Sequence, residues 1–202
     1  MTVVVVLAAL AVVLTVRYVK SQQAPEEIDL QVIRTKGDPS AEVKVIEYFD
    51  FQCPACAFGA KALEEYYARF PNKIFIQAKY YPLSGHQHAM TAAKYAECSA
   101  RQGVFWPMYN LLFGRQNQWS RMVDARPAFD LMVKELKLNQ KAIEACIEDP
   151  EILAAIMKDK REGNLIGIRS TPTFLVNQEV VVGFKSLAEK LSSLFEDNEV
   201  EN

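Results

Sequence analysis

Two cysteines three positions apart, Cys53 and Cys56, are the residues of this 202-residue chain best suited to chemistry. A Cys-x-x-Cys pair can close into a disulfide and exchange it with another thiol through a mixed disulfide. The same spacing occurs in zinc sites, but zinc usually takes a second ligand pair, and the other two cysteines, Cys98 and Cys146, stand alone. The spacing therefore favours thiol–disulfide exchange, and the alternative is two cysteines that only pack or form a structural link.

The surroundings of the pair make the motif more specific. Residues 43–49 are rich in β-branched and aromatic side chains and predict a strand, and Pro54 can open a helix directly after Cys53. A thiol at the start of a helix faces unpaired N–H groups and the positive end of the helix dipole, which stabilise the thiolate. We therefore expect Cys53 to be the nucleophile and Cys56 to resolve the mixed disulfide.

A second element lies far along the chain, where Thr171-Pro172 precedes a predicted strand over residues 173–176. Proline at the start of a strand removes a hydrogen-bond donor and normally marks an edge or a bend. A cis bond before Pro172 would bring the backbone of Thr171 beside the sulfur atoms, where it could pair with an extended peptide. Most bonds before proline are trans, so the dipeptide gains its meaning only from the Cys-x-x-Cys motif upstream.

The elements that must position these residues follow from the hydrophobic pattern. Strands separated by helices predict an α/β fold with a mixed sheet that is covered on both faces. A long helical block between the two halves of the sheet indicates an inserted subdomain. The expected order is a strand at 43–49, a helix from Pro54, a strand at 73–81, helices from about 86 to 166, a hairpin of strands 173–176 and 180–183 turning at Asn177-Gln178, and a final helix capped by Ser186.

The N-terminal residues predict a membrane segment. Residues 2–16 form an uncharged apolar run that, as a helix, would span roughly 22 Å of a bilayer core of about 30 Å. We expect an uncleaved transmembrane helix at 1–19; a cleaved signal peptide is the alternative, but such peptides normally have a basic start, which this run lacks. The expected division is an anchor at 1–19, a linker at 20–41 with a short strand at 30–34, a folded domain at 42–196 and an acidic tail at 197–202.

The orientation of this anchor involves two opposing signals. Arg17 and Lys20 directly follow the apolar run, and by the positive-inside rule they would place the domain in the cytoplasm. Redox-active and paired cysteines argue for the other side, because cytosolic thiols are kept reduced. We expect a single-pass protein of the cytoplasmic membrane with its catalytic domain in the periplasm or at the cell surface.

The composition limits the class of partner. Half of the residues are apolar and the formal net charge is −2, which suits one globular domain with a substantial core. Nucleic-acid binding normally needs a clustered excess of Lys and Arg, and the sequence contains no such cluster. We therefore expect no nucleic-acid partner.

Three segments of the chain resemble the DsbA-like thiol–disulfide oxidoreductases of bacteria, which belong to the thioredoxin superfamily. They are Glu-Tyr-Phe-Asp-Phe-Gln-Cys-Pro-Ala-Cys at 47–56, Ala-Glu-Cys-Ser-Ala-Arg-Gln-Gly-Val-Phe-Trp at 96–106 and Gly-Ile-Arg-Ser-Thr-Pro-Thr-Phe-Leu-Val-Asn at 167–177. The resemblance extends over about 37–195. It implies a thioredoxin-like fold with an inserted helical subdomain.

The resemblance also implies roles for individual residues. They are Cys53 as nucleophile, Cys56 as resolving cysteine, Pro172 as the cis-proline with Thr171 before it, and Glu47 as the acidic residue beneath the active site. A partly buried carboxylate at Glu47 could relay a proton to or from Cys56. The alternative is a glutamate on the exposed face of a strand. Lys79 on the neighbouring strand is a possible ion-pair partner for Glu47.

The implied function is an enzyme that passes the Cys53–Cys56 disulfide to unfolded or folding exported proteins, with no other cofactor and no metal. A membrane quinone reductase of the DsbB or vitamin-K-epoxide-reductase kind would reoxidise it. Ala55 stands where the best-known members have His, and Thr171 occurs before the cis-proline in isomerases and reductases. A disulfide isomerase or reductase is therefore the first alternative, and a tethered chaperone for metal delivery or assembly is the second.

Two further expectations concern the rest of the domain. Cys98 and Cys146 lie in predicted helices of the insertion and are left over after the active pair, so we expect them to form a structural disulfide. Two separately buried thiols are the alternative. We also expect a monomer, because residues 21–41 are too short for the separate N-terminal domain on which the related isomerases dimerise.

Overall fold

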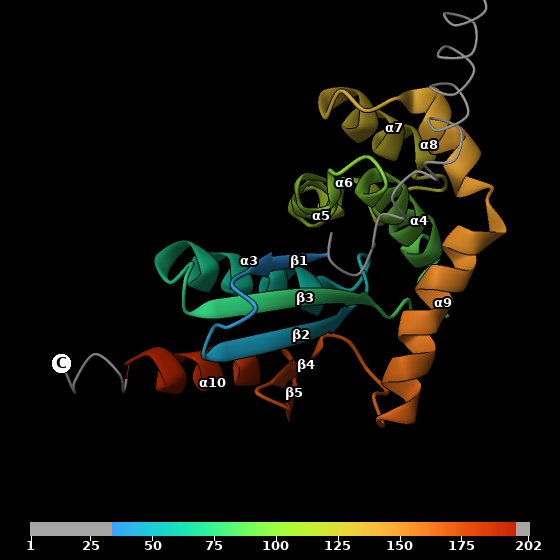
Figure 1. The fold of residues 1–202 in the computed structure, drawn as a ribbon. Helices are drawn as coiled ribbons and strands as arrows, with labels where there is room; N and C mark the ends of the chain where they lie inside the picture. The colour runs from blue at the N-terminus through green and yellow to red at the C-terminus, as the bar shows by residue number, and fades with distance from the viewer. Residues whose placement is uncertain (1–33, 197–202) are drawn as a thin grey trace, which may run out of the picture.

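The computed structural model describes residues 34–196, which form a five-stranded mixed sheet with helices packed around it (Figure 1). The strands are β1 (Thr35–Gly37), β2 (Val43–Phe49), β3 (Ile74–Tyr80), β4 (Thr173–Val176) and β5 (Glu179–Val182). They lie in the order β1-β3-β2-β4-β5, in which β2 is parallel to β3 and the other neighbours are antiparallel. This is the α/β arrangement expected from the sequence.

Two helices belong to the sheet and the others form the insertion. The former are α3 (Pro54–Arg69) and α10 (Phe184–Glu196). The inserted helices are α4 (Ala89–Ala100), α5 (Phe105–Gly114), α6 (Gln116–Trp119), α7 (Arg126–Glu135), α8 (Gln140–Ile147) and α9 (Pro150–Leu165). Figure 1 shows α4 to α8 gathered above the sheet and α9 running down past one end of it. The bounds of these helices agree closely with the predicted insertion at about 86–166.

One face of the sheet is covered by α3 and α10. Leu63 of α3 and Leu187 and Leu191 of α10 are buried together with Val45 and Ile76 of the central strands. Apolar side chains recur every three or four residues on the helices and every second residue on the strands, so each element presents one continuous apolar surface to the other.

The opposite face is covered only in part, so the expectation of a sheet covered on both faces is too simple. The C-terminal half of α9 covers one end of it, where Gly163 lies so close to Tyr48 and Tyr81 that a Cβ atom would be 3.1 Å from both rings. Farther along the same face, Val180 and Val182 of β5 are more than half exposed.

The insertion shares one apolar core with the end of the sheet that leads into α3. Phe49 and Phe51 pack edge to face or tilted against Tyr109 and Phe113 of α5, with ring centroids 4.9 to 5.8 Å apart. All four side chains are at least nine-tenths buried. The insertion is therefore part of the same domain and forms one wall of the region around the first turn of α3.

The predicted linker at 20–41 is wrong from Arg34 onward. The short strand lies at Thr35–Gly37, beyond the predicted 30–34, and it extends the sheet beside β3. Arg34 is buried, with its guanidinium paired to Asp159 of α9 and 3.5 Å from Glu97 of α4. The chain is thus fixed to the domain before residue 42, because a buried cation needs these carboxylates around it.

The terminal predictions lie outside the described residues. These are the transmembrane helix at 1–19, the first part of the linker and the acidic tail at 197–202. Among residues 34–196, no helix combines the length and apolar character needed to cross a bilayer.

The C-terminal hairpin turns where the sequence predicts it. Asn177 and Gln178 both have positive φ, 48° and 74°, which is the geometry of a type I′ turn between antiparallel strands. The predicted cap of the last helix is wrong, because α10 already begins at Phe184 and Ser186 lies within its first turn. The residue before the helix is Gly183, whose φ of 84° lets the chain change direction there.

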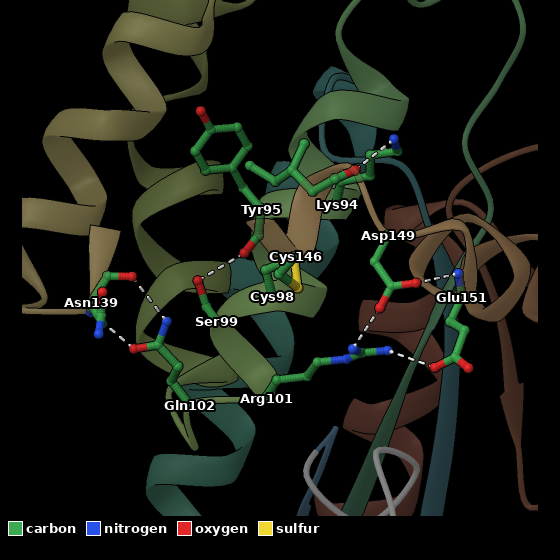
Figure 2. Close-up of a disulfide and its surroundings, with 11 residues drawn as sticks. Lys94, Tyr95, Cys98, Ser99, Arg101, Gln102, Asn139, Cys146, Asp149 and Glu151 are labelled. Carbon is green, nitrogen blue, oxygen red and sulfur yellow. Dashed lines mark hydrogen bonds and ion pairs between the residues drawn. A yellow bond between two sulfur atoms is a disulfide. The ribbon is translucent and has the colours of Figure 1, made fainter. Parts of the chain in front are cut away.

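A disulfide joins Cys98 of α4 to Cys146 of α8 (Figure 2). Its sulfur atoms are 2.09 Å apart and the Cα atoms 5.8 Å apart. Figure 2 also shows Arg101, just after α4, reaching Asp149 and Glu151 at the start of α9. The end of α4 is therefore held to two later helices by one covalent and two ionic contacts.

Removal of this disulfide should destabilise the domain. We expect the Cys98→Ala/Cys146→Ala variant to lose about 4 kcal/mol of unfolding free energy, because a link across 48 residues restricts the unfolded chain. Urea unfolding followed by circular dichroism measures the loss. Wild-type protein in strong reductant is the matched control and should fall to a similar stability. An unchanged midpoint in the double variant would contradict the expectation.

Candidate active site

The first turn of α3 places Cys53 at the end of the helix. Cys53 is the residue before the helix, with extended backbone (φ −74°, ψ 119°), and Pro54 occupies the first helical position. The N–H of Cys53 donates to Asp50 O at 3.1 Å, and the N–H of Cys56 donates to Cys53 O at 3.1 Å. Because no side chain among residues 34–196 caps this helix, the sulfur atom of Cys53 is free to interact with the N-terminal N–H groups of α3.

The cis peptide bond expected before Pro172 is present and lies beside the nucleophilic sulfur. In the dithiol form seen here, the Cys53 thiol donates to the carbonyl oxygen of Thr171 at 3.4 Å. Pro172 also lies near Gly59 of α3, where a Cβ atom would be 3.7 Å from the proline ring and 2.9 Å from Phe174. Cys53 and Thr171, which are 118 positions apart in the sequence, are thus brought together by the fold.

The two thiols differ in solvation and in acidity. Cys53 is 7% exposed, whereas Cys56 is fully buried. The hydrogen bond from the Cys56 thiol, followed by the Thr171 side chain and the N–H groups of Cys56 and Ala55, lowers the pKa of Cys53 to about 5 against the opposing effect of burial. Burial, and then the adjacent Cys53 sulfur, raises the pKa of Cys56 well above its ordinary value. The lowered pKa of Cys53 has the direction expected at a helix start, but the Cys56 thiol contributes more to it than the helix N–H groups do.

Glu47 lies fully buried on β2, so the alternative of an exposed glutamate is wrong. The hydroxyl of Tyr109 donates to Glu47 Oε2 at 2.6 Å. Burial raises the pKa of Glu47 to about 7, although Tyr109 and then Lys36 act in the opposite direction. The negative charge of Glu47 in turn contributes to the raised pKa of Cys56. A carboxyl group that titrates near neutral pH therefore lies close enough to the resolving cysteine to affect its charge.

The possible ion pair between Lys79 and Glu47 is wrong. Glu47 is in register with Ala78 of β3, and Lys79 is in register with Tyr48. Successive residues of a strand face opposite sides of the sheet, so Lys79 lies on the other face, where it pairs with Glu162 of α9.

An acidic residue that the sequence analysis did not identify fixes the loop before the nucleophile. The buried carboxylate of Asp50 accepts the N–H groups of Gln52 at 2.7 Å and Leu83 at 2.8 Å, and it is 2.8 Å from His86 Nδ1. The N–H of Asp50 points at the sulfur of Cys56, 3.5 Å away. The available signal was local, since an aspartate two residues before a polar residue in a strand-to-helix turn often accepts that residue's N–H.

Gln116 of α6 supports the same loop from the insertion. Its side-chain amide donates to the carbonyl oxygens of Phe51 at 2.7 Å and Cys53 at 2.9 Å. Contacts from the sheet side and from the insertion therefore hold both ends of the turn that carries the nucleophile. Among residues 34–196, no three His, Cys, Asp or Glu side chains are grouped so that they could hold a metal ion.

The two thiols should differ in reactivity across pH. Because the pKa of Cys53 is lowered to about 5, we expect its alkylation by iodoacetamide to reach half of its maximal rate near that pH. Cys56 should remain unmodified up to about pH 8, since its buried thiol stays protonated. Peptide mass spectrometry of reduced protein gives both rates. Cys56→Ala is an informative comparison, since loss of its hydrogen bond should raise the pKa of Cys53. Equal rates for the two cysteines at about pH 6 would contradict the assignment.

Comparison with known proteins agrees with this geometry. A sequence model described as "Thioredoxin" matches residues 31–197. Among solved structures, BdbD from Bacillus subtilis superposes with a TM-score of 0.71 at 19% identity, covering 81% of this chain and 91% of BdbD. Wolbachia pipientis alpha-DsbA1 gives 0.69 at 21% identity, covering 83% of this chain and 93% of that protein. Pseudomonas aeruginosa DsbA2 superposes with a TM-score of 0.62 at 23% identity, covering 81% of this chain and 94% of that protein.

Curated relatives include much longer proteins. The protein named Na(+)/H(+) antiporter NhaA 1 from Mycobacterium sp. (strain KMS) is 27% identical over 164 residues, which are 76% of this chain and 26% of the antiporter. The antiporter of that name from Salinispora arenicola is 33% identical over 145 residues, which are 70% of this chain and 21% of the antiporter. The chain thus spans about a quarter of the length of these relatives. On the match over residues 31–197 and the shared fold, the chain belongs to the thioredoxin family, with a DsbA-like fold.

Proposed function

We propose that this chain catalyses thiol–disulfide exchange through Cys53 and Cys56. The observation that carries the proposal is the inequality of the two sulfur atoms within one helical turn. Cys53 lies beside the cis-Pro172 bond with a pKa of about 5, and Cys56 is buried with a raised pKa. A low-pKa nucleophile at the end of a helix, with a resolving thiol beside it, is the arrangement that exchange requires. The shared fold agrees with this proposal, since one structure of that fold, alpha-DsbA2 from Wolbachia pipientis, is described as a thiol–disulfide exchange protein.

The proposed reaction passes the disulfide to a substrate in two steps. A substrate thiolate attacks the sulfur of Cys53 in the Cys53–Cys56 disulfide, and Cys56 leaves and receives a proton from Glu47. A second substrate thiolate then attacks the substrate sulfur of the mixed disulfide, and Cys53 leaves as a thiolate. The substrate loses two electrons and the Cys53–Cys56 pair gains them. The low pKa of Cys53 favours the second step, because a more acidic thiol is a better leaving group.

We further propose that the direction is disulfide formation. A stabilised Cys53 thiolate stabilises the reduced form, which makes the disulfide more oxidising. Two residues favour the alternative of an isomerase or reductase. Ala55 replaces the histidine of the best-known oxidants, and Thr171 precedes the cis-proline as in isomerases and reductases. The lowered pKa of Cys53, about 5, lies between values of about 7 for thioredoxin and about 3.5 for DsbA.

Substrates and partners are proposed on chemical grounds. Folding exported proteins offer the free thiols that an oxidase consumes, and a membrane quinone reductase of the DsbB or vitamin-K-epoxide-reductase type could accept the electrons. The Cys98–Cys146 disulfide supports an oxidising compartment outside the cytoplasm, and residues 1–19 would tether a monomeric domain there. Relatives named as antiporters agree with a membrane setting.

A C-terminal alkaline phosphatase fusion tests this location, and it should be active in cells if the domain lies outside the cytoplasm. A fusion that stays inactive in cells would contradict this location.

Capture of a mixed disulfide tests the exchange activity. In Cys56→Ala the Cys53 thiolate can still attack a disulfide of another protein, but the resulting mixed disulfide has no neighbouring thiol to resolve it, so the variant should accumulate covalent complexes that reductant releases. Non-reducing electrophoresis of cells, followed by mass spectrometry of the complexes, detects them. Cys53→Ala is the matched control and should capture nothing. If Cys56→Ala shows no complexes and the wild type fails to reduce insulin, the proposed activity is wrong.

The redox potential tests the direction of exchange. We expect a value between about −270 mV, as in thioredoxin, and about −120 mV, as in DsbA. Ala55→His should raise it by some tens of millivolts, because a cation beside Cys53 stabilises the thiolate. Equilibration with glutathione gives both values, and Ala55→Gln controls for side-chain size. A wild-type potential at or below that of thioredoxin would favour the reductase alternative.

A further inference from the structure

A tyrosine of the inserted subdomain is bound to the buried carboxylate beneath the redox pair. Tyr109 lies on α5, is 3% exposed, and donates its hydroxyl to Glu47 Oε2 at 2.6 Å across 62 residues of sequence. The other oxygen, Oε1, has no hydrogen-bond partner among the described residues. A carboxylate buried with so few donors depends strongly on each of them, because an unpaired buried charge is costly.

The ring of Tyr109 is fixed by its neighbours, so its hydroxyl has a defined position. It contacts Phe49 edge to face at 5.4 Å between centroids, Phe113 at 4.8 Å and Trp106 at 5.2 Å. These partners come from β2 and from α5. Aromatic packing of this kind would hold the ring in place without the hydroxyl, so the hydrogen bond to Glu47 can be removed with little change in packing.

The groups that face Glu47 from each neighbouring element are few. On α5 the titratable group is Tyr109, and on β1 it is Lys36, whose positive charge is shared with Glu64 of α3. On α3 it is Cys56, whose pKa is raised in part by the charge of Glu47. The residues in register with Glu47 on β3 and β4 are Ala78 and Phe174, which carry no charge. Tyr109 is therefore the direct donor, and Lys36 acts at longer range.

We propose that Tyr109 is a positioning residue for the exchange reaction: its hydroxyl holds the Glu47 carboxyl group where it can exchange a proton with Cys56, and it favours the ionised form that accepts the proton of Cys56 during resolution. The proposal rests on the proposed function, since it concerns the proton step of thiol–disulfide exchange. It gives the inserted subdomain a direct part in that step, through a single hydroxyl group.

The step can be written for the resolution of a mixed disulfide. The Cys56 thiol gives its proton to Glu47, and the resulting thiolate attacks the sulfur of Cys53. The Cys53–Cys56 bond forms, the bond from Cys53 to the substrate breaks, and the substrate leaves as a thiolate. In the oxidising direction the same path runs in reverse, and protonated Glu47 returns the proton to the departing Cys56.

The sign of the effect follows from the donor. The Tyr109 hydroxyl stabilises the charged form of Glu47, so its loss should raise the pKa of Glu47 from about 7. At pH 7 fewer molecules would then carry the carboxylate that accepts the proton of Cys56. The resolution step would need a higher pH, and the rise of its rate with pH would move upward by the same amount.

Tyr109→Phe tests the proposal, since it removes the hydroxyl and keeps the ring. We expect the acid side of the pH–rate profile for mixed-disulfide resolution to shift upward by about one unit, which is about tenfold in rate at pH 6. Tyr95→Phe is the matched control, because Tyr95 is also a buried tyrosine of the insertion that donates to a carboxylate, Asp130, at 2.7 Å. Its profile should coincide with that of the wild type.

Two further measurements separate the outcomes. In protein labelled with carboxyl-13C glutamate, the titration of Glu47 should move upward by a similar amount in Tyr109→Phe. Glu47→Gln should remove the acid-side dependence, and adding Tyr109→Phe to it should change nothing more. An unshifted Glu47 titration, or unshifted kinetics in an active Tyr109→Phe protein, overturns the proposal. A wild type without exchange activity overturns the proposed function instead, and this proposal with it.

Discussion

The redox site depends on the unequal solvation of two sulfur atoms in the first turn of one helix. Cys53 lies at the open N-terminal end of α3, where N–H groups favour negative charge, and Cys56 lies in the core, where burial opposes it. This inequality directs attack to one sulfur atom. It also creates a difficulty, because the buried Cys56 must gain a proton when the Cys53–Cys56 disulfide opens and lose one when it closes. A titratable group in the core, such as Glu47, would supply or accept that proton. A buried carboxylate in turn needs a hydrogen-bond donor.

The need for burial explains why the insertion packs where it does. Without α5, the aromatic side chains of Phe49 and Phe51 would be exposed beside the active-site turn, and Glu47 would lie closer to water. The buried group of Arg34, Glu97 and Asp159 also fixes the insertion to the residue directly before β1. Buried ion pairs contribute little net stability, but only one arrangement satisfies all of their charges, so they restrict how the two parts can pack.

The sequence predicted the features that depend on local pattern, and it missed those that depend on side-chain contacts between distant segments. The Cys-x-x-Cys motif, the helix start at Pro54, the hairpin turn and the insertion have local signals of composition and spacing. The partner of Glu47 does not, because it depends on strand register and on how α5 packs. Lys79 of the neighbouring strand was the expected ion-pair partner of Glu47. It follows Ala78, the residue opposite Glu47, by one position and therefore lies on the other face of the sheet. Tyr109 could not be identified either, because no sequence pattern distinguishes a tyrosine whose hydroxyl donates to a buried carboxylate.

The domain must keep one disulfide inert while the other exchanges, and helix direction offers a physical reason for the difference. Cys98 lies in the last turn of α4 and Cys146 in the last turn of α8, close to the negative ends of their helix dipoles. A thiolate is disfavoured there, so the reduced form gains none of the stabilisation that Cys53 receives at a helix start. A disulfide whose reduced form is not stabilised resists reduction, and Cys98 is also buried from attacking thiolates. The helix dipole therefore acts in opposite senses at the two pairs: it favours the thiolate of Cys53 at a helix start and disfavours thiolates at Cys98 and Cys146 near helix ends.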